Sequence, residues 1–305
     1  MPTMKAIRKA GANLELCRLE VPRPGAGEVQ VRVESAGVCR TDVHVARGRL
    51  PSADPVVLGH EFAGVVTALG DGVTNVGRGD RVAVLPLMPC GACIVCQKDD
   101  PINCPRRTML GVDRDGAFAA FVVVPAALAY VLPETVPFAA AAYAEPIAAA
   151  LGVMAAGLSP QGRGLVMGHN RFAVLIERLL RLHGFRDLVV GDEAEGDEFD
   201  FVIETGLSDD TLWRMTRAAR PGGTLVLRSR RPGPFALDAL TAVTKQLTIR
   251  AVNYGPFRRA LGLLVEGALD LGGLVGPAHP LEEYEEVFAG AERSEDVKLF
   301  FDPWA

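Results

Sequence analysis

The chain has 305 residues, 49% of them hydrophobic, and a formal net charge of −5. This length predicts two domains with substantial cores, and the sequence carries no basic stripe of the kind that nucleic-acid binding requires. The N-terminus lacks the apolar stretch of a signal peptide, and no apolar run is expected to reach the length of a membrane span. We therefore expect a cytoplasmic protein with no nucleic-acid or membrane partner.

The first 150 residues are predicted to be rich in β-strands. Residues 29–37 alternate apolar and polar side chains with period two, which is typical of a half-buried strand. Residues 61–70, 80–86 and 117–125 are further strand candidates, punctuated by glycine or ended by proline. The pattern favours a compact antiparallel domain from which a cysteine-rich loop departs.

That loop, CGACIVCQKDDPINC, places four thiols in fifteen residues: Cys90, Cys93, Cys96 and Cys104. Four thiolates can close a tetrahedral zinc site, and such a closed site is structural because no position remains for water or substrate. Disulfides are not expected in a cytoplasmic protein. Cys17 lies in an alternating stretch and is predicted to be a packed strand residue.

A second set of metal-binding residue types precedes the loop. Cys39, His60 and Glu61 offer one sulfur, one nitrogen and one carboxylate, and three protein ligands with an open position are typical of catalytic zinc. Each residue alone fits ordinary packing or a solvated surface. Together with the nearby loop they predict a second, working metal that polarises an alcohol or carbonyl oxygen.

The character of the sequence changes near residue 140. Residues 138–157 are rich in alanine and predict a helix that Pro146 interrupts. Beyond them, strands alternate with helices, which favours βαβ units on a parallel sheet. The predicted strands are 164–168, 187–192, 199–206, 223–229 and 247–252, and the predicted helices are 171–184 and 211–223. Two amphipathic helices follow residue 256.

Five motifs in order carry a family resemblance: GVCRTDVH, VVLGHEFAGVV, the C-x2-C-x2-C-x7-C loop, GVDRDGAFAAFVVVP and AEPIAAAL. The chain resembles the zinc-dependent medium-chain alcohol dehydrogenases over essentially its whole length, and AEPIA is most similar to the polyol, sugar and threonine branch. The resemblance implies an α/β protein with a GroES-like β-rich catalytic domain, residues 1–150 completed by 257–305. A Rossmann-like dinucleotide-binding domain would occupy residues 151–256.

The resemblance also implies two zinc ions per chain. Cys39 and His60 would bind the catalytic zinc, and the cysteine loop would bind the structural one. Glu145 in AEPIA would be a ligand directly or through water. Glu61 would be the neighbouring ligand, exchanging with water or substrate.

The same resemblance implies roles for the residues around Cys39. Thr41 would hydrogen-bond the substrate hydroxyl, and His44 would pass the released proton towards solvent through the cofactor ribose. Imidazole suits this task because it titrates near neutral pH. Arg40 would lie against the cofactor pyrophosphate, with a solvated surface charge as the alternative.

The glycine-rich dinucleotide fingerprint, G-x-G-x-x-G/A, is degenerate in this chain. Gly168 supplies the first position and Ala173 the last, but Asn170 replaces the second glycine, whose absence of a side chain lets the backbone approach the pyrophosphate. Arg171 would stand at the helix N-terminus, where anions bind. Thr205, near the end of the third predicted strand of this half, is predicted to be a further cofactor-binding residue.

Asp192, at the end of the second strand, is the candidate acid for the adenosine ribose. An acid there repels a 2′-phosphate, so NAD is favoured over NADP, although Arg171 could offset this preference. Too few residues follow Asp192 to form the helix and strand usual at this point. We therefore predict a shortened, five-stranded sheet that lacks one edge strand and leaves a thinner wall on the adenine side.

Two functions remain open at this stage. The first is a zinc-dependent oxidoreductase that moves a hydride between NAD and a secondary alcohol such as a polyol, a sugar or a similar small hydroxy compound. The alternative is a zinc protein of the same fold that has lost NAD binding and acts as a non-redox lyase, hydratase or hydrolase, or as a binding subunit. A small-molecule substrate and a homo-oligomer, dimer or tetramer, are expected in the first case.

Overall fold

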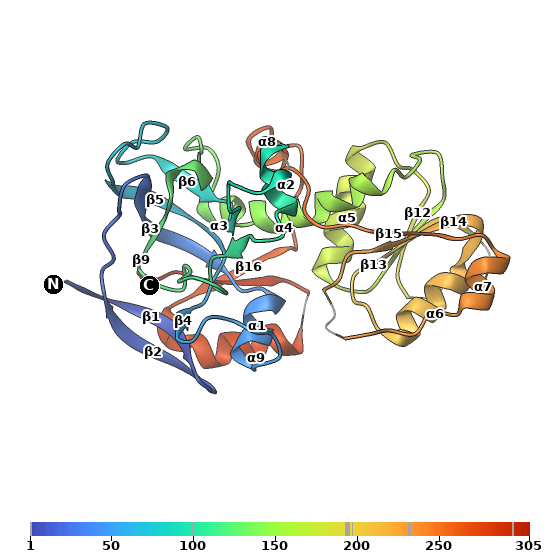
Figure 1. The fold of residues 1–305 in the computed structure, drawn as a ribbon, viewed down its shortest axis with the longest axis horizontal. Coiled ribbons are helices and arrows are strands. Elements are labelled where there is room, and N and C mark those ends of the chain that lie inside the picture. Colours follow the sequence, from blue (N-terminus) through green and yellow to red (C-terminus); the bar gives the residue numbers. More distant parts are fainter. Residues whose placement is uncertain (1, 99–100, 193–195, 197, 231–232, 295) are drawn as a thin grey trace. The chain divides into compact units, whose positions relative to one another are not determined.

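The computed structural model describes all residues except 1, 99–100, 193–195, 197, 231–232 and 295 (Figure 1). The chain forms two compact units. The first comprises Met1–Glu145, Leu264–Glu266 and Gly272–Ala305, and the second comprises Pro146–Leu263 and Gly267–Leu271.

The first unit is built mainly from strands, as expected. Its described strands are β1 (Thr3–Ala10), β2 (Asn13–Glu20), β3 (Glu28–Gly37), β4 (Val56–Val57), β5 (Glu61–Leu69), β6 (Arg81–Val84), β7 (Leu87–Met88), β8 (Thr108–Met109), β9 (Phe121–Pro125), β10 (Ala129–Val131), β16 (Val275–His279) and β17 (Lys298–Phe301). Its helices are α1 (Arg40–Ala46), α2 (Ile94–Gln97), α3 (Phe138–Ala142) and α9 (Tyr284–Arg293), with 3₁₀ turns at Pro101–Asn103, Ala126–Leu128 and Leu281–Glu283.

In the central sheet of this unit, β3 is the strand that pairs with the largest number of the described strands. β3 pairs antiparallel with β5, β9 and β17, and β16 adds to β17 in parallel. The predicted period-two burial of β3 is confirmed, because every second side chain from Val29 to Val33 is buried. The register places Gly37 opposite both Glu61 and Phe300. The end of β3, the start of β5 and the second half of β17 therefore meet at one point.

The second unit alternates strands and helices, and two of its helices cross the division between the units. Its described strands are β11 (Gly164–Met167), β12 (Leu188–Val190), β13 (Phe199–Glu204), β14 (Ala219–Leu227) and β15 (Thr248–Ala251). Its helices are α4 (Ala144–Leu151), α5 (Arg171–Leu182), α6 (Asp209–Ala218), α7 (Ala239–Thr244) and α8 (Phe257–Val265), with a 3₁₀ turn at Gly152–Ala156.

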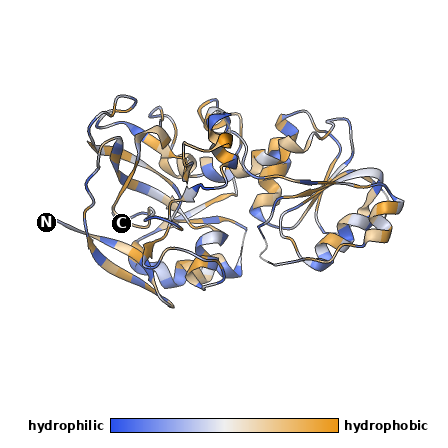
Figure 2. Ribbon diagram, viewed as in Figure 1, coloured by the Kyte–Doolittle hydropathy of each residue, from blue (hydrophilic) through white to orange (hydrophobic). Residues whose placement is uncertain are grey.

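The sheet of the second unit confirms the predicted shortened Rossmann-like architecture. Within the described residues its order is β12-β11-β13-β14-β15 and every pairing is parallel. β12 is an edge strand, which is the place where a third strand would continue a doubly wound sheet. The helices show alternating hydrophobic and hydrophilic bands (Figure 2), and α6 buries Leu212 and Met215 against Val202 and Leu225 of the sheet.

The alanine-rich stretch differs from the prediction in two ways. The helix breaks at Tyr143, between α3 and α4, and not at Pro146. Pro146 lies in the first turn of α4, where a proline is tolerated because its missing amide would have no partner inside the helix. In addition, Phe138–Ala156 is long and apolar enough to cross a membrane by length and composition, contrary to our expectation. This stretch is 67% buried inside the protein, which is typical of core helices.

Candidate active site

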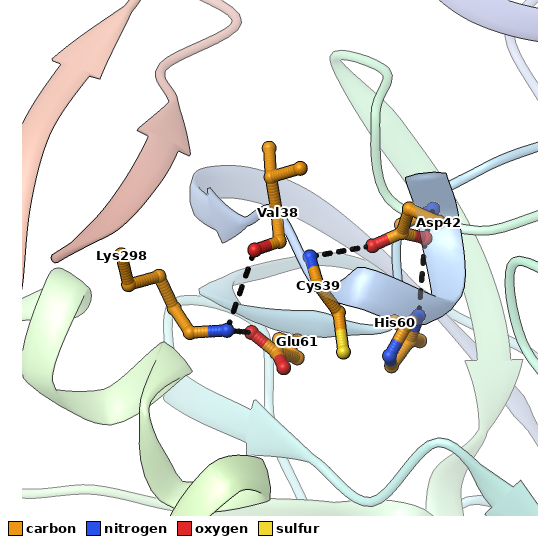
Figure 3. Close-up of polar contacts among 7 residues, drawn as sticks. Val38, Cys39, Asp42, His60, Glu61 and Lys298 are labelled. Carbon is orange, nitrogen blue, oxygen red and sulfur yellow. Dashed lines mark hydrogen bonds and ion pairs between the residues drawn. The ribbon is translucent and has the colours of Figure 1, made fainter. Parts of the chain in front are cut away.

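The structure brings together the predicted upstream metal set. Donor atoms of Cys39, His60 and Glu61 all lie within 4.8 Å of one another. Cys39 follows β3 by two residues, and His60 and Glu61 stand at the start of β5, so the pairing of Gly37 with Glu61 accounts for their convergence. Figure 3 shows the thiol, the imidazole and the carboxylate directed into one space.

Asp42 organises two of these three residues. Its carboxylate is completely buried; Oδ2 accepts a hydrogen bond from the Cys39 amide at 2.9 Å, and Oδ1 lies 3.1 Å from both the Gly59 amide and His60 Nδ1 (Figure 3). A carboxylate on Nδ1 fixes the imidazole tautomer and leaves Nε2 for a metal. Asp42, the acid of the GVCRTDVH motif, is therefore the residue that orients His60.

The site concentrates negative charge around a buried imidazole. Burial by itself lowers the pKa of His60, but the charges of Asp42 and Cys39, and hydrogen bonds to both, raise that pKa well above its ordinary value. The donor set therefore favours a positive charge at this position. A divalent cation satisfies the same demand as a proton on the imidazole and adds direct bonds to the sulfur, nitrogen and oxygen donors.

Glu61 has a buried cationic partner that sequence reasoning missed. Lys298, the first residue of β17, donates from Nζ to Glu61 Oε2 and lies 3.4 Å from the carbonyl oxygen of Val38. Both side chains are 2% exposed. Gly37 makes room for them, because a Cβ atom there would lie 2.9 Å from Glu61 Oε2 and from Lys298 Cδ. The ion pair balances the carboxylate and holds one of its oxygens.

Replacing Lys298 with Met is expected to destabilise the protein by about 3–5 kcal/mol, because it leaves the buried Glu61 carboxylate without its partner. The free energy of unfolding, from denaturant titration, measures this cost. Adding Glu61→Gln to Lys298→Met should recover part of the loss, since the double variant no longer buries an uncompensated charge.

The matched control is Lys5→Met, which removes the exposed ion pair that Lys5 makes with Glu282. Exposed pairs typically contribute about 1 kcal/mol or less, so a much smaller change is expected. Equal losses for the two variants would show that the buried pair has no special role.

The residues predicted to handle substrate and proton lie on α1. Thr41 and His44 are half-buried and three positions apart, so they share one face of the helix. Arg40 is exposed and donates from Nη1 to the Glu292 carbonyl oxygen at 3.3 Å, while Arg47 and Arg49 bind the Glu292 carboxylate. These contacts hold α1 against α9.

Glu145 is not a member of the three-residue group. It is buried, at 4% exposure, in the first turn of α4. Among the residues that the structure describes, the groups able to hold a metal are the Cys39, His60 and Glu61 set and the four-cysteine set. Its predicted role as a ligand, directly or through water, stays a prediction.

The cysteine loop also closes on itself. The Sγ atom of Cys93 lies 3.5 Å from that of Cys96 and 3.7 Å from that of Cys104, and Cys90 lies 4.0 Å from Cys96. α2, which carries Cys96, buries none of its residues. The loop therefore has little core of its own, and its four thiols are the groups that can hold it.

The thiols differ in acidity. Backbone hydrogen bonds, first that of Ala92, lower the pKa of Cys90 to about 6, whereas desolvation and neighbouring thiols raise the pKa of Cys96 to about 12. Four adjacent thiolates repel one another, so they cannot all ionise without a cation. A bound Zn²⁺ removes this conflict, because the metal displaces the thiol protons.

In the second unit, the turn after β11 keeps its first glycine. Gly168 has φ +126°, and a Cβ atom there would lie 2.1 Å from Thr205 Oγ1. The Thr205 hydroxyl donates to the Met167 carbonyl oxygen at 2.7 Å and accepts from Asn170 Nδ2 at 2.9 Å. The hydroxyl of Thr205, a residue predicted to contact cofactor, thus makes both of these hydrogen bonds within the turn.

Asn170, which replaces the second glycine of the fingerprint, has extended backbone. Its φ is −129°, and its side-chain oxygen accepts from the amides of Phe172 and Ala173, each at 3.0 Å, as an N-cap of α5. The asparagine therefore folds back on its own helix. It occupies two amides that an anion at this helix end would otherwise share.

The other two predicted cofactor residues differ in exposure. Arg171 is buried at the start of α5, with 8% exposure. The Asp192 side chain is 38% exposed at the end of β12, and its carboxylate lies 3.7 Å from His169 Nε2. Asp192 is thus accessible to a ribose, while Arg171 is largely covered.

Comparison with known proteins defines the class. Residues 25–134 match the alcohol dehydrogenase GroES-like domain. The starvation-sensing protein RspB of Escherichia coli is 35% identical over 240 residues, which cover 77% of this chain and 69% of that protein. L-threonine 3-dehydrogenase of Bacillus licheniformis is 25% identical over 346 aligned positions, 98% of this chain and 99% of that protein.

Solved structures agree with this result. A zinc-binding dehydrogenase from Sinorhizobium meliloti bound to NADP superposes with a TM-score of 0.92 at 27% identity, over 99% of this chain and 100% of that chain. An E. coli RspB structure with NADH gives 0.90 at 25% identity, with the same coverage. This chain belongs to the zinc-binding medium-chain alcohol dehydrogenase family, as its sequence motifs predicted.

Proposed function

We propose that this protein is a zinc-dependent oxidoreductase that moves a hydride between a secondary alcohol and NAD. The observation that carries the proposal is the convergence of Cys39, His60 and Glu61, with Asp42 fixing the imidazole. Such a donor set suits a catalytic metal and not a structural one, because it supplies three ligands and leaves a position for an oxygen-bearing substrate. Relatives named for polyol and hydroxy-amino-acid dehydrogenation support a small hydrophilic alcohol as substrate.

The two donor clusters fit two zinc ions with different tasks. Cys39, His60 and Glu61 would hold the catalytic ion, with Glu145 as the candidate for a further contact, and the four cysteines of the loop would hold the structural ion. When bound, the catalytic ion supplies Lewis acidity that lowers the pKa of a substrate hydroxyl. Lys298 keeps the Glu61 carboxylate paired and so favours its exchange with substrate over permanent ligation.

Two residues of α1 would transfer the proton that the substrate hydroxyl releases. Thr41 would accept a hydrogen bond from the substrate hydroxyl, and His44, on the same helical face, would carry the proton towards solvent. Neither step requires a change of main-chain conformation, because the two residues are fixed by one helix.

The second unit fits a dinucleotide at its adenosine end. Gly168 keeps the turn tight, and Asp192 at the carboxyl end of β12 offers its carboxylate to ribose hydroxyls. An acid at this position favours NAD over NADP. Asn170 competes for the α5 amides, which favours weaker binding at the pyrophosphate than a full glycine fingerprint would give.

A second candidate function rests on the same asparagine. If the capped turn excludes the pyrophosphate, the protein has lost NAD binding and acts as a non-redox zinc enzyme or binding subunit. The intact donor set and the accessible Asp192 favour the oxidoreductase.

We also propose a homo-oligomer built on β15. This strand ends the parallel sheet, and all four of its residues are exposed. Leu240 and Val243 of the neighbouring α7 are 79% and 75% exposed. A second copy that adds its own β15 would pair the open edge and cover part of this apolar surface.

The proposed function is tested by a metal count together with an NADH titration of the purified protein. We expect two zinc ions per chain and saturable enhancement of nicotinamide fluorescence. Two zinc ions without a saturable signal up to millimolar NADH would replace the oxidoreductase by the non-redox alternative. A chain that retains no metal at Cys39 and His60 would remove both.

A further inference from the structure

Three side chains from three different elements gather at residue 192. Asp192 lies two residues after β12, His169 belongs to the turn after β11, and Arg214 lies on α6. Arg214 donates from Nη1 to the main-chain carbonyl oxygen of Asp192 at 3.2 Å. His169 faces the Asp192 carboxylate at 3.7 Å, and its ring also borders Gly191. One contact therefore restrains the main chain of residue 192 and the other its side chain.

The arrangement matters because β12 lies at the edge of the sheet. β12 is an edge strand of three residues, and in a doubly wound sheet a further helix and strand would follow it and cover its end. The described residues place no strand beyond β12. The Gly191 amide donates to the Val166 carbonyl oxygen at 3.1 Å, so the hydrogen bonds of the sheet reach residue 191. The direction of the Asp192 carboxylate, one residue further on, depends on contacts from outside the sheet.

Arg214 also lies against an acid of its own helix. Its Nε lies 3.0 Å from the Asp210 carboxylate one helical turn earlier, and its side chain is 34% exposed. In the part of the chain that the structure describes, Asp210 is the acid whose carboxylate pairs with this guanidinium. The guanidinium group is planar and rigid. When one of its nitrogens is paired, another can donate a hydrogen bond with little further loss of side-chain conformational entropy.

We propose, resting on the proposed function, that Arg214 is a positioning residue for cofactor selectivity. It fixes the main chain at Asp192 in place of the missing segment, so that the carboxylate meets the 2′-hydroxyl of the adenosine ribose and repels a 2′-phosphate. His169, in the turn after β11, restrains the Asp192 carboxylate. Arg214 acts through Asp192 and makes no contact of its own with the reacting atoms.

The test measures dissociation constants for NADH and NADPH separately, by nicotinamide fluorescence, on the intact protein. Arg214→Met is expected to weaken NADH about tenfold while changing NADPH by less than twofold, so the selectivity for NADH falls about tenfold. Asp192→Asn should lose at least as much selectivity. The matched control is Arg217→Met on the same helix, whose guanidinium stacks on Trp213 and should leave both constants unchanged.

A double variant separates positioning from a general structural role. If Arg214 acts through Asp192, adding Arg214→Met to Asp192→Asn changes neither constant by more than twofold. Additive losses, or a loss of NADH and NADPH in equal proportion, would overturn the inference. If wild-type protein binds NADH but Arg214→Met keeps full selectivity, only the inference fails. If wild-type protein binds neither nucleotide, the proposed function fails and the inference with it.

Discussion

Replacing Cys96 with Ala is expected to release one zinc ion per chain and to make the first unit unfold or aggregate. Structural zinc has apparent binding free energies of about 10–16 kcal/mol in zinc-finger peptides, which is comparable with the whole stability of a domain, about 5–15 kcal/mol. The described part of the cysteine loop has little apolar core to compensate, since α2 buries none of its residues. Metal analysis and the midpoint of thermal unfolding measure the two effects.

The control for this variant is Cys17→Ala. Cys17 is half-buried on β2, its thiol lies 3.6 Å from the Ala6 carbonyl oxygen, and it belongs to neither of the two donor groups. It should keep both metals and shift stability only slightly. If the Cys96 variant remains soluble with its full metal content, the loop is not a metal site.

Much of this architecture was predictable because it depends on local signals. The alternation in residues 29–37 predicted β3, and the strand-helix alternation after residue 160 predicted a parallel sheet. The short interval after Asp192 predicted the missing edge strand, since no helix and strand fit into so few residues. The two metal sets were visible because each is compact in sequence.

The contacts that tune the site were not predictable, because they join distant residues or depend on backbone geometry. Lys298 is 237 positions from Glu61, and only the pairing of β17 with β3 brings them together. Asp42 is one acid among many in the sequence until its burial is known. The pattern showed that Asn170 departs from the glycine fingerprint, but not that its side chain would cap α5.

The pairing register of β3 at Gly37 accounts for the position of the donor residues and of Lys298. Gly37 pairs with Glu61 on one side and Phe300 on the other, so the three strands converge where Cys39 leaves the sheet. Because Gly37 has no Cβ atom, it leaves space for the ion pair between Glu61 and Lys298. A one-residue slip would turn Glu61 to the opposite face of its strand. The site therefore depends on the sheet as much as on its ligands.

Replacing Cys39 with Ala is expected to abolish turnover while the fold survives. The thiolate is one of three converging donors, and without it the catalytic ion is held too weakly to polarise substrate. Lewis-acid stabilisation amounts to several kcal/mol, so kcat/KM should fall at least about a thousandfold. Steady-state kinetics with a small polyol, after metal analysis of the same sample, measures the loss.

The two cysteine variants together discriminate between the sites, because each should lose one zinc with opposite consequences. Cys39→Ala should keep the thermal midpoint near that of the parent, since Cys39 is only half-buried and the four-cysteine loop still holds its ion. Cys96→Ala should lose the fold itself. Equal collapse of both variants would mean that the Cys39 ion stabilises structure. Turnover preserved in Cys39→Ala would show that the thiolate, and the catalytic metal built around it, has no part in the reaction.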